Sequence, residues 1–107
     1  METDCVVVWT TISTTADGRN LASVLVGERL AACVNVLPPM ESVYRWKGEV
    51  EAEPERQLIM KTTSARVPAL KARLFQLHDY DVPEFIVMPI IDGSDAYLNW
   101  IRASTAG

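Results

Sequence analysis

Three side chains of types that bind transition metals lie within seven residues of one another: His78, Asp81 and Glu84. An imidazole combined with carboxylates suits copper(II), zinc or a similar divalent ion. No HxxxH or CxxC pair fixes a coordination geometry, so such a site would borrow Cys33 or a residue of a neighbouring subunit. The sequence therefore predicts a metal site formed by His78, Cys33, Asp81 and Glu84, with copper or another divalent ion as the cofactor.

Each of these residue types also has a simpler interpretation. His78 would be a solvated histidine near a helix C-terminus, where the helix dipole favours a cation. Cys33, inside a hydrophobic run, would be a small buried packing residue. A run of alternating glutamates is expected to form the solvated face of a hairpin: Glu49, Glu51, Glu53 and Glu55.

Aromatic residues indicate a second kind of site. Tyr44, Trp46, Tyr80 and Trp100, together with Lys61 and Glu84, would line a cleft where subunits meet, a common position for pockets. Such a cleft would bind a small regulatory ligand. Alternatively, Tyr44 and Trp46 would be anchors of a subunit interface, because aromatic residues are enriched there.

Catalysis is not expected. Arg19 and Asn20 are the residue types that an acylphosphatase uses to hold phosphate and orient water. Both fall inside a predicted helix, however, and no glycine-rich phosphate loop precedes them. His78 has no serine or cysteine partner at a suggestive spacing. We therefore predict no catalytic residues and no organic cofactor.

The order of predicted elements indicates the fold class. Valine-rich or helically periodic segments alternate with capping and turn residues. The expected elements are a strand over 5–11, a helix over 16–30, a long hairpin over 31–63, a helix over 64–77, a strand over 85–91 and a short helix around 97–101. This order, βαββαβ followed by α, is typical of a ferredoxin-like α+β fold with two helices on one face of an antiparallel sheet.

Interruptions are expected within the hairpin. Pro38 and Pro39 predict a bend or bulge in its outgoing strand, and Lys47 to Glu49 mark its tip. Glu53 and Pro54 are expected to interrupt the returning strand.

The hairpin is too long for one small domain to cover. From Cys33 to Trp46 it would span roughly 45 Å at the rise of a strand. A compact chain of this length would be only about 34 Å across. The runs 6–9 and 85–88 are also apolar on both alternating faces, whereas two helices hide one face only. We therefore predict a closed homo-oligomer.

Composition limits the function classes further. With 107 residues and 49% apolar content, the chain has room for one domain spanning 1–107. Its net charge of −4 disfavours nucleic acid and anionic membrane surfaces as partners. Met1 to Asp4 are acidic where a secretory signal would be basic, and no apolar run is long enough to span a bilayer. Two cysteines without a CxxC spacing favour reduced thiols, so a cytoplasmic location is expected.

Five segments in order resemble the CutA family of divalent-cation tolerance proteins. They are Leu30-Ala31-Ala32-Cys33-Val34-Asn35, Tyr44-Arg45-Trp46-Lys47-Gly48, Ile59-Met60-Lys61-Thr62, His78-Asp79-Tyr80-Asp81-Val82-Pro83-Glu84 and Tyr97-Leu98-Asn99-Trp100-Ile101. The chain departs from the family pattern at Asp79, where a proline is usual, and at Asp81, where a glutamate is usual.

The resemblance implies a ferredoxin-like homotrimer, similar in architecture to PII signalling proteins, that is linked to tolerance of copper and other divalent metals and has no established catalytic activity. We therefore expect a small homotrimeric binding protein whose activity is divalent metal binding, chiefly of copper. One alternative is a PII-like sensor that binds a small ligand in an intersubunit cleft. Another is a trimeric scaffold for a protein partner that the sequence does not identify.

Overall fold

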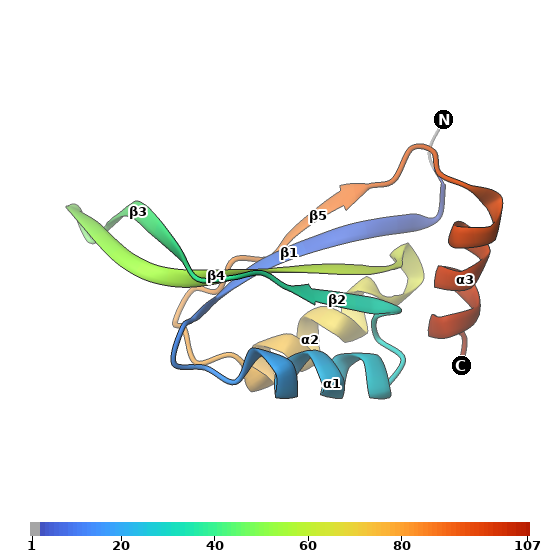
Figure 1. Cartoon of the computed structure of the whole chain (residues 1–107), viewed down its shortest axis with the longest axis horizontal. Helices are drawn as coiled ribbons and strands as arrows, with labels where there is room; N and C mark the ends of the chain where they lie inside the picture. Colours follow the sequence, from blue (N-terminus) through green and yellow to red (C-terminus); the bar gives the residue numbers. More distant parts are fainter. Residues whose placement is uncertain (1–2) are drawn as a thin grey trace.

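Five strands form one antiparallel sheet within residues 3–107, which the computed structural model describes (Figure 1). Met1 and Glu2, part of the acidic N-terminal stretch, lie outside the described residues. The elements are β1 (Cys5–Ser13), α1 (Gly18–Gly27), β2 (Cys33–Val36), β3 (Met40–Trp46), β4 (Glu49–Thr63), the 3-10 helix η1 (Ser64–Arg66), α2 (Val67–Leu77), β5 (Ile86–Pro89) and α3 (Asp95–Thr105). The strands lie in the order β2-β4-β1-β5, and β3 also pairs with β4. This arrangement confirms the predicted α+β fold.

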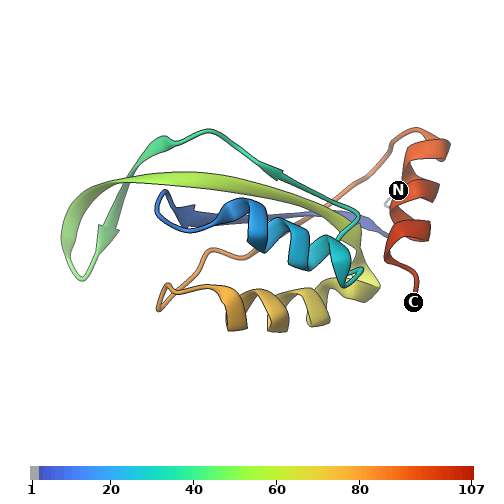
Figure 2. The ribbon, with the colours of Figure 1, turned by 60° about the horizontal axis from the view of Figure 1, so that its bottom comes forward.

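Helices α1 and α2 lie side by side on one face of the sheet (Figure 2). The Asp17 carboxylate caps α1 by accepting a hydrogen bond from the Asn20 amide, and Pro68 occupies the first turn of α2, where a missing N–H is tolerated. Their apolar stripes pack on every second residue of β1 and β4. The core between them contains Val6, Val8, Ile12, Leu21, Leu25, Leu30, Ala31, Leu58, Met60, Leu70 and Leu74.

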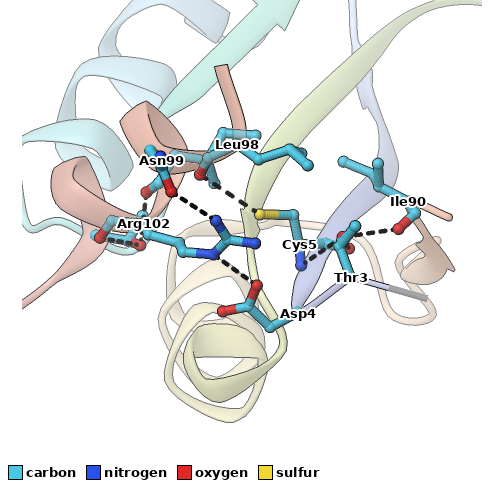
Figure 3. A network of polar contacts seen from close by, with 9 residues as sticks. Thr3, Asp4, Cys5, Ile90, Leu98, Asn99 and Arg102 are labelled. Atoms are coloured by element: carbon cyan, nitrogen blue, oxygen red, sulfur yellow. Dashed lines mark hydrogen bonds and ion pairs between the residues drawn. The ribbon is translucent and has the colours of Figure 1, made fainter. Parts of the chain in front are cut away.

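Helix α3 covers one end of the opposite face and is longer than the predicted 97–101. Leu98 and Ile101 pack on Cys5 and Ala32 in a second, smaller core. Figure 3 shows the polar contacts that hold this end: Arg102 pairs with Asp4 at 2.7 Å, and the Cys5 thiol donates to the Leu98 carbonyl. None of the helices within residues 3–107 combines the length and apolar character needed to cross a bilayer.

The β3–β4 hairpin, which we call the arm (residues 40–55), projects beyond the helices (Figure 1). The molecule is accordingly elongated, with extents of 44 × 29 × 24 Å. The predicted bend at Pro38 and Pro39 is confirmed, because β2 ends at Val36 and β3 begins at Met40. At the tip, Lys47 and Gly48 both take the positive φ angles that a tight hairpin turn requires.

One prediction about the arm was wrong. Pro54 does not interrupt the returning strand, since β4 runs without a break from Glu49 to Thr63. Pairing between β1 and β4 ends at the Ser13–Glu55 pair, so Pro54 lies where β4 has a neighbour, β3, on one side only. A residue without an N–H is tolerated at such an edge position.

The middle of the sheet face opposite α1 and α2 is left uncovered. Register places five apolar residues there, and we call them the open sheet face: Val7, Trp9, Ile59, Ile86 and Met88. Ile86 and Met88 are each 50% exposed. The indole N–H of Trp9 is buried and has no hydrogen-bond partner among the described residues.

The helix-side core predicts that truncating two leucines of α2 lowers the free energy of unfolding by different amounts. Leu74 is fully buried and Leu77 is 38% exposed. Leu74→Ala should lower the free energy of unfolding by about 2–5 kcal/mol, because truncation leaves a cavity. Leu77→Ala, the matched control, should cost less than about 1 kcal/mol. Denaturant titration at one fixed protein concentration measures both, and equal losses would contradict this account of the core.

Candidate ligand cleft beside the arm

A cavity of about 530 Å³ lies between the arm and the loop that precedes β5. We call it the arm cleft. Its lining residues are Met40, Ser42, Tyr44 and Trp46 from β3; Glu55 and Gln57 from β4; Thr11 from β1; and residues 80–84 from the loop.

Strand alternation explains the wall that β3 provides. Side chains two residues apart share a face of a strand, so Tyr44 and Trp46 both point into the arm cleft whereas Val43 does not. Their partners on β4 are glutamates: Glu51 opposite Tyr44 and Glu49 opposite Trp46. Aromatic rings and carboxylates therefore occupy the same face of the arm.

Glu55 is the most buried acidic residue of the arm. Its exposed fraction is only 8%, which corrects the expectation that it belongs to a solvated face. The Tyr80 hydroxyl donates to its Oε2 at 2.7 Å. Among the described residues, no basic side chain forms an ion pair with Glu55. The carboxylate is therefore hydrogen-bonded but has no neutralising charge.

The pKa values of both tyrosines in the arm cleft, Tyr44 and Tyr80, are raised. Burial raises the pKa of Tyr80 first of all, and the hydrogen bond to Glu55 and the charge of Glu55 raise it further. Burial likewise raises the pKa of Tyr44, followed by the charges of Glu53, Glu51 and Glu55. Burial first, and the nearby carboxylates second, therefore favour the neutral form of both phenols.

His78 anchors the loop instead of facing the solvent. Its side chain is completely buried at the C-cap of α2, so the simpler interpretation of a solvated histidine was wrong. The Tyr80 amide donates to Nδ1 at 3.1 Å. Nε2 must then carry the proton and donate to the Thr11 carbonyl at 2.7 Å. Both ring nitrogens are engaged, and neither lone pair is free for a metal in this conformation.

The four predicted metal ligands are only partly brought together. Asp81 and Glu84 line the arm cleft, and Glu84 accepts a hydrogen bond from Gln57 at 2.8 Å. His78 is buried in the base of the same loop, and Cys33 lies on β2, away from the cleft lining. Within residues 3–107 no group of three or more His, Cys, Asp or Glu side chains is placed to hold a metal ion. The ligand set stays a prediction.

The predicted aromatic cleft is recovered in part. Tyr44, Trp46 and Tyr80 line the arm cleft together. Lys61 does not reach it, because its ammonium donates to Asn35 on the sheet at 2.8 Å, and Trp100 packs against Tyr97 on α3 instead.

Sequence reasoning missed Glu55, Gln57 and Thr11 as part of the cleft. Glu55 pairs with Ser13 and Gln57 with Thr11 across β4 and β1. The alternating pattern of β4 places Glu55 and Gln57 on the same face as Ile59, and this signal alone would have suggested their common orientation.

The Tyr80–Glu55 hydrogen bond predicts an alkaline titration. Because the folded state favours the neutral phenol, the stability that Tyr80 contributes is complete below its ordinary pKa of 10.0 and is lost as the pH rises further. In Glu55→Gln the ionisation of Tyr80 should move to lower pH, since the charge of Glu55 no longer opposes the tyrosinate. Ultraviolet absorbance of tyrosinate, assigned with Tyr80→Phe, measures this. Glu41→Gln, on the other face of the arm, is the control, and an unchanged curve in Glu55→Gln would contradict the assignment.

Comparison with known proteins defines the family. Residues 6–104 match the family model described as CutA1 divalent ion tolerance protein. The divalent-cation tolerance protein CutA of Thermus thermophilus is 46% identical over 92% of this chain and 96% of its own length. The chloroplastic protein CutA of Arabidopsis thaliana is 45% identical over 94% of this chain, which spans only 55% of that plant relative.

Solved structures agree with the family match. A divalent cation tolerance protein from Thermus thermophilus superposes with a TM-score of 0.91 at 45% identity, over 95% of this chain and 99% of that one. CutA1 from Shewanella sp. SIB1 superposes with a TM-score of 0.93 at 31% identity, over 100% of both chains. The family model and both Thermus thermophilus matches are named for tolerance of divalent ions or cations and not for a catalysed reaction. The chain belongs to the CutA1 family of divalent ion tolerance proteins.

Proposed function

We propose that this chain acts in the cytoplasm as a homotrimer that takes part in divalent-cation tolerance by binding a divalent ion, with copper(II) as the first ion to test. The role in tolerance follows from the family and its relatives. The observation that carries the assembled state is the open sheet face, which α1 and α2 do not cover.

Apolar exposure supports self-assembly. Ile86 and Met88 on the sheet, and Val43 and Val50 on the arm, are each at least half exposed. Apolar surface exposed on both the sheet and the arm is typical of an interface. Three copies arranged about one axis would cover all the open sheet faces at once.

Carboxylates support the metal part of the proposal. Asp81 is exposed, Glu84 is half-buried, and both line the arm cleft. Oxygen ligands of this kind bind divalent ions, and the remaining ligands would come from a second chain, from Cys33, or from His78 after it releases one hydrogen bond.

A second candidate function is the binding of a small organic ligand in the arm cleft. The favouring observation is the size of the cavity, about 530 Å³, together with its aromatic wall. Small-molecule sites commonly have volumes of about 300–1,000 Å³ and combine apolar walls with a few polar groups. This chain would then act as a sensor within the trimer.

The assembly proposal predicts the behaviour of a charge substitution. Met88→Glu places a carboxylate on the open sheet face, and Val26→Glu, at a residue that is 40% exposed on α1, is the control. At micromolar concentration the unmodified chain and Val26→Glu should sediment as trimers, whereas Met88→Glu should dissociate or unfold because a buried unpaired charge is costly. Analytical ultracentrifugation checks this. A folded single subunit of the unmodified chain would rule out the assembly.

The metal proposal predicts a loss of copper(II) affinity. In the double variant Asp81→Asn, Glu84→Gln, calorimetric titration should show at least about a tenfold weaker affinity than in the unmodified trimer, since two anionic ligands become neutral amides. Asp92→Asn, an exposed carboxylate outside the arm cleft, is the control. Cys33→Ser and His78→Ala test the other two predicted ligands. Undiminished binding in the double variant and in both single variants would exclude the predicted ligand set.

A further inference from the structure

We propose that the arm cleft binds a small organic cation, an alkylammonium or quaternary ammonium group, with Glu55 as its counter-ion and Tyr44, Trp46 and Tyr80 as its aromatic wall. The inference rests on the second candidate function above, small-ligand binding in this cleft, and specifies the charge of the ligand.

The charge of the lining carries the inference. Glu55, Asp81 and Glu84 line the cleft, and none of its lining residues is basic. Glu55 is more than nine-tenths buried, and only its Oε2 has a hydrogen-bond donor, the Tyr80 hydroxyl, among the described residues. A buried carboxylate is costly unless an opposite charge accompanies it. The cleft therefore presents an uncompensated negative charge to its occupant.

Aromatic rings indicate an organic cation as the ligand of Glu55. Tyr44 and Trp46 line the cleft and are each 40% exposed, so their rings are available to a ligand. Aromatic faces attract cations, and alkylated ammonium groups in particular. The ring of Trp46 already has the ammonium of Lys47 at 5.8 Å from its centroid. A cavity of about 530 Å³ is also far larger than one ion requires.

The same charges disfavour an anionic ligand. Burial is the main cause of the raised pKa of Tyr44 and Tyr80, and the charges of the arm glutamates raise it further. A nucleotide or another phosphate compound would meet these charges without a basic side chain in the lining to offset them. The cleft thus differs in charge from a site built to hold phosphates.

Two chemically matched probes test the proposal on the assembled protein. Choline carries a quaternary ammonium, and 3,3-dimethyl-1-butanol has nearly the same shape without the charge. Calorimetry and the NMR signals of the tryptophan indole N–H groups should show saturable binding of choline and at least tenfold weaker binding of the neutral alcohol. ATP should not bind.

Matched variants identify the counter-ion. Glu55→Gln keeps the shape of the side chain and an oxygen that accepts from Tyr80, but it removes the charge. This variant should bind choline at least tenfold more weakly. Glu41→Gln, on the opposite face of the arm, should leave choline binding unchanged. Equal affinity for choline and the neutral alcohol, unchanged choline binding in Glu55→Gln, or no choline binding at all would overturn the proposal.

Other outcomes separate this inference from the proposed function. If the neutral alcohol or ATP binds in the cleft and choline does not, the cleft is a ligand site but the assigned charge is wrong. A crystal structure in which a lysine or arginine of a second copy pairs with Glu55 would overturn the inference, because the counter-charge would then be built in. Neither outcome affects the copper titration or the sedimentation result.

Discussion

The fold and the candidate site both depend on the continuity of β4. This strand is 15 residues long and pairs with β1, β2 and β3 at different points along its length. Its C-terminal part, paired with β1 and β2, lies over the helix-side core. Its N-terminal part extends beyond β1 and supports the arm. Glu55 and Gln57 lie where these two parts meet, so the same backbone that builds the sheet also forms the floor of the arm cleft.

Core packing and strand alternation together determine on which face of β4 the side chains of Glu55 and Gln57 lie. The core needs the apolar residues of β4 on the helix side, and alternation then assigns the intervening residues to the other face. Glu55 is one of these intervening residues, and its carboxylate lies beside the loop before β5. The Tyr80 hydroxyl stabilises the carboxylate there by a hydrogen bond. His78 fixes the same loop by its two hydrogen bonds to Thr11 and Tyr80. Polar contacts thereby connect the loop to β4 and β1, in addition to the packing of Phe85 against the core.

Local patterns in the sequence were sufficient for the fold. Helical periodicity, valine-rich runs and capping residues report on neighbours in the chain, and they predicted the order of the elements and a hairpin that projects from the domain. The prediction for Pro54 was wrong because a strand tolerates proline where one side has no neighbouring strand. The point at which β1 stops pairing with β4 decides this, and it depends on residues far apart in the sequence. The site was predicted less completely for the same reason. Lys61 and Trp100 have suitable chemistry, but register and the packing of α3 direct them elsewhere.

The arm has a further consequence for how the protein behaves in a crowded solution. Among the strands of residues 3–107, β3 pairs with β4 alone, so the outer edge of β3 presents backbone donors and acceptors to a strand of another molecule. Such an edge is a template for intermolecular β-pairing and fibril growth. The glutamates that alternate along the arm act as gatekeepers, because like charges repel, and Pro54 removes one backbone donor from β4 where β1 no longer pairs with it. The acidity that gives the cleft its potential also keeps a long exposed ribbon from aggregating.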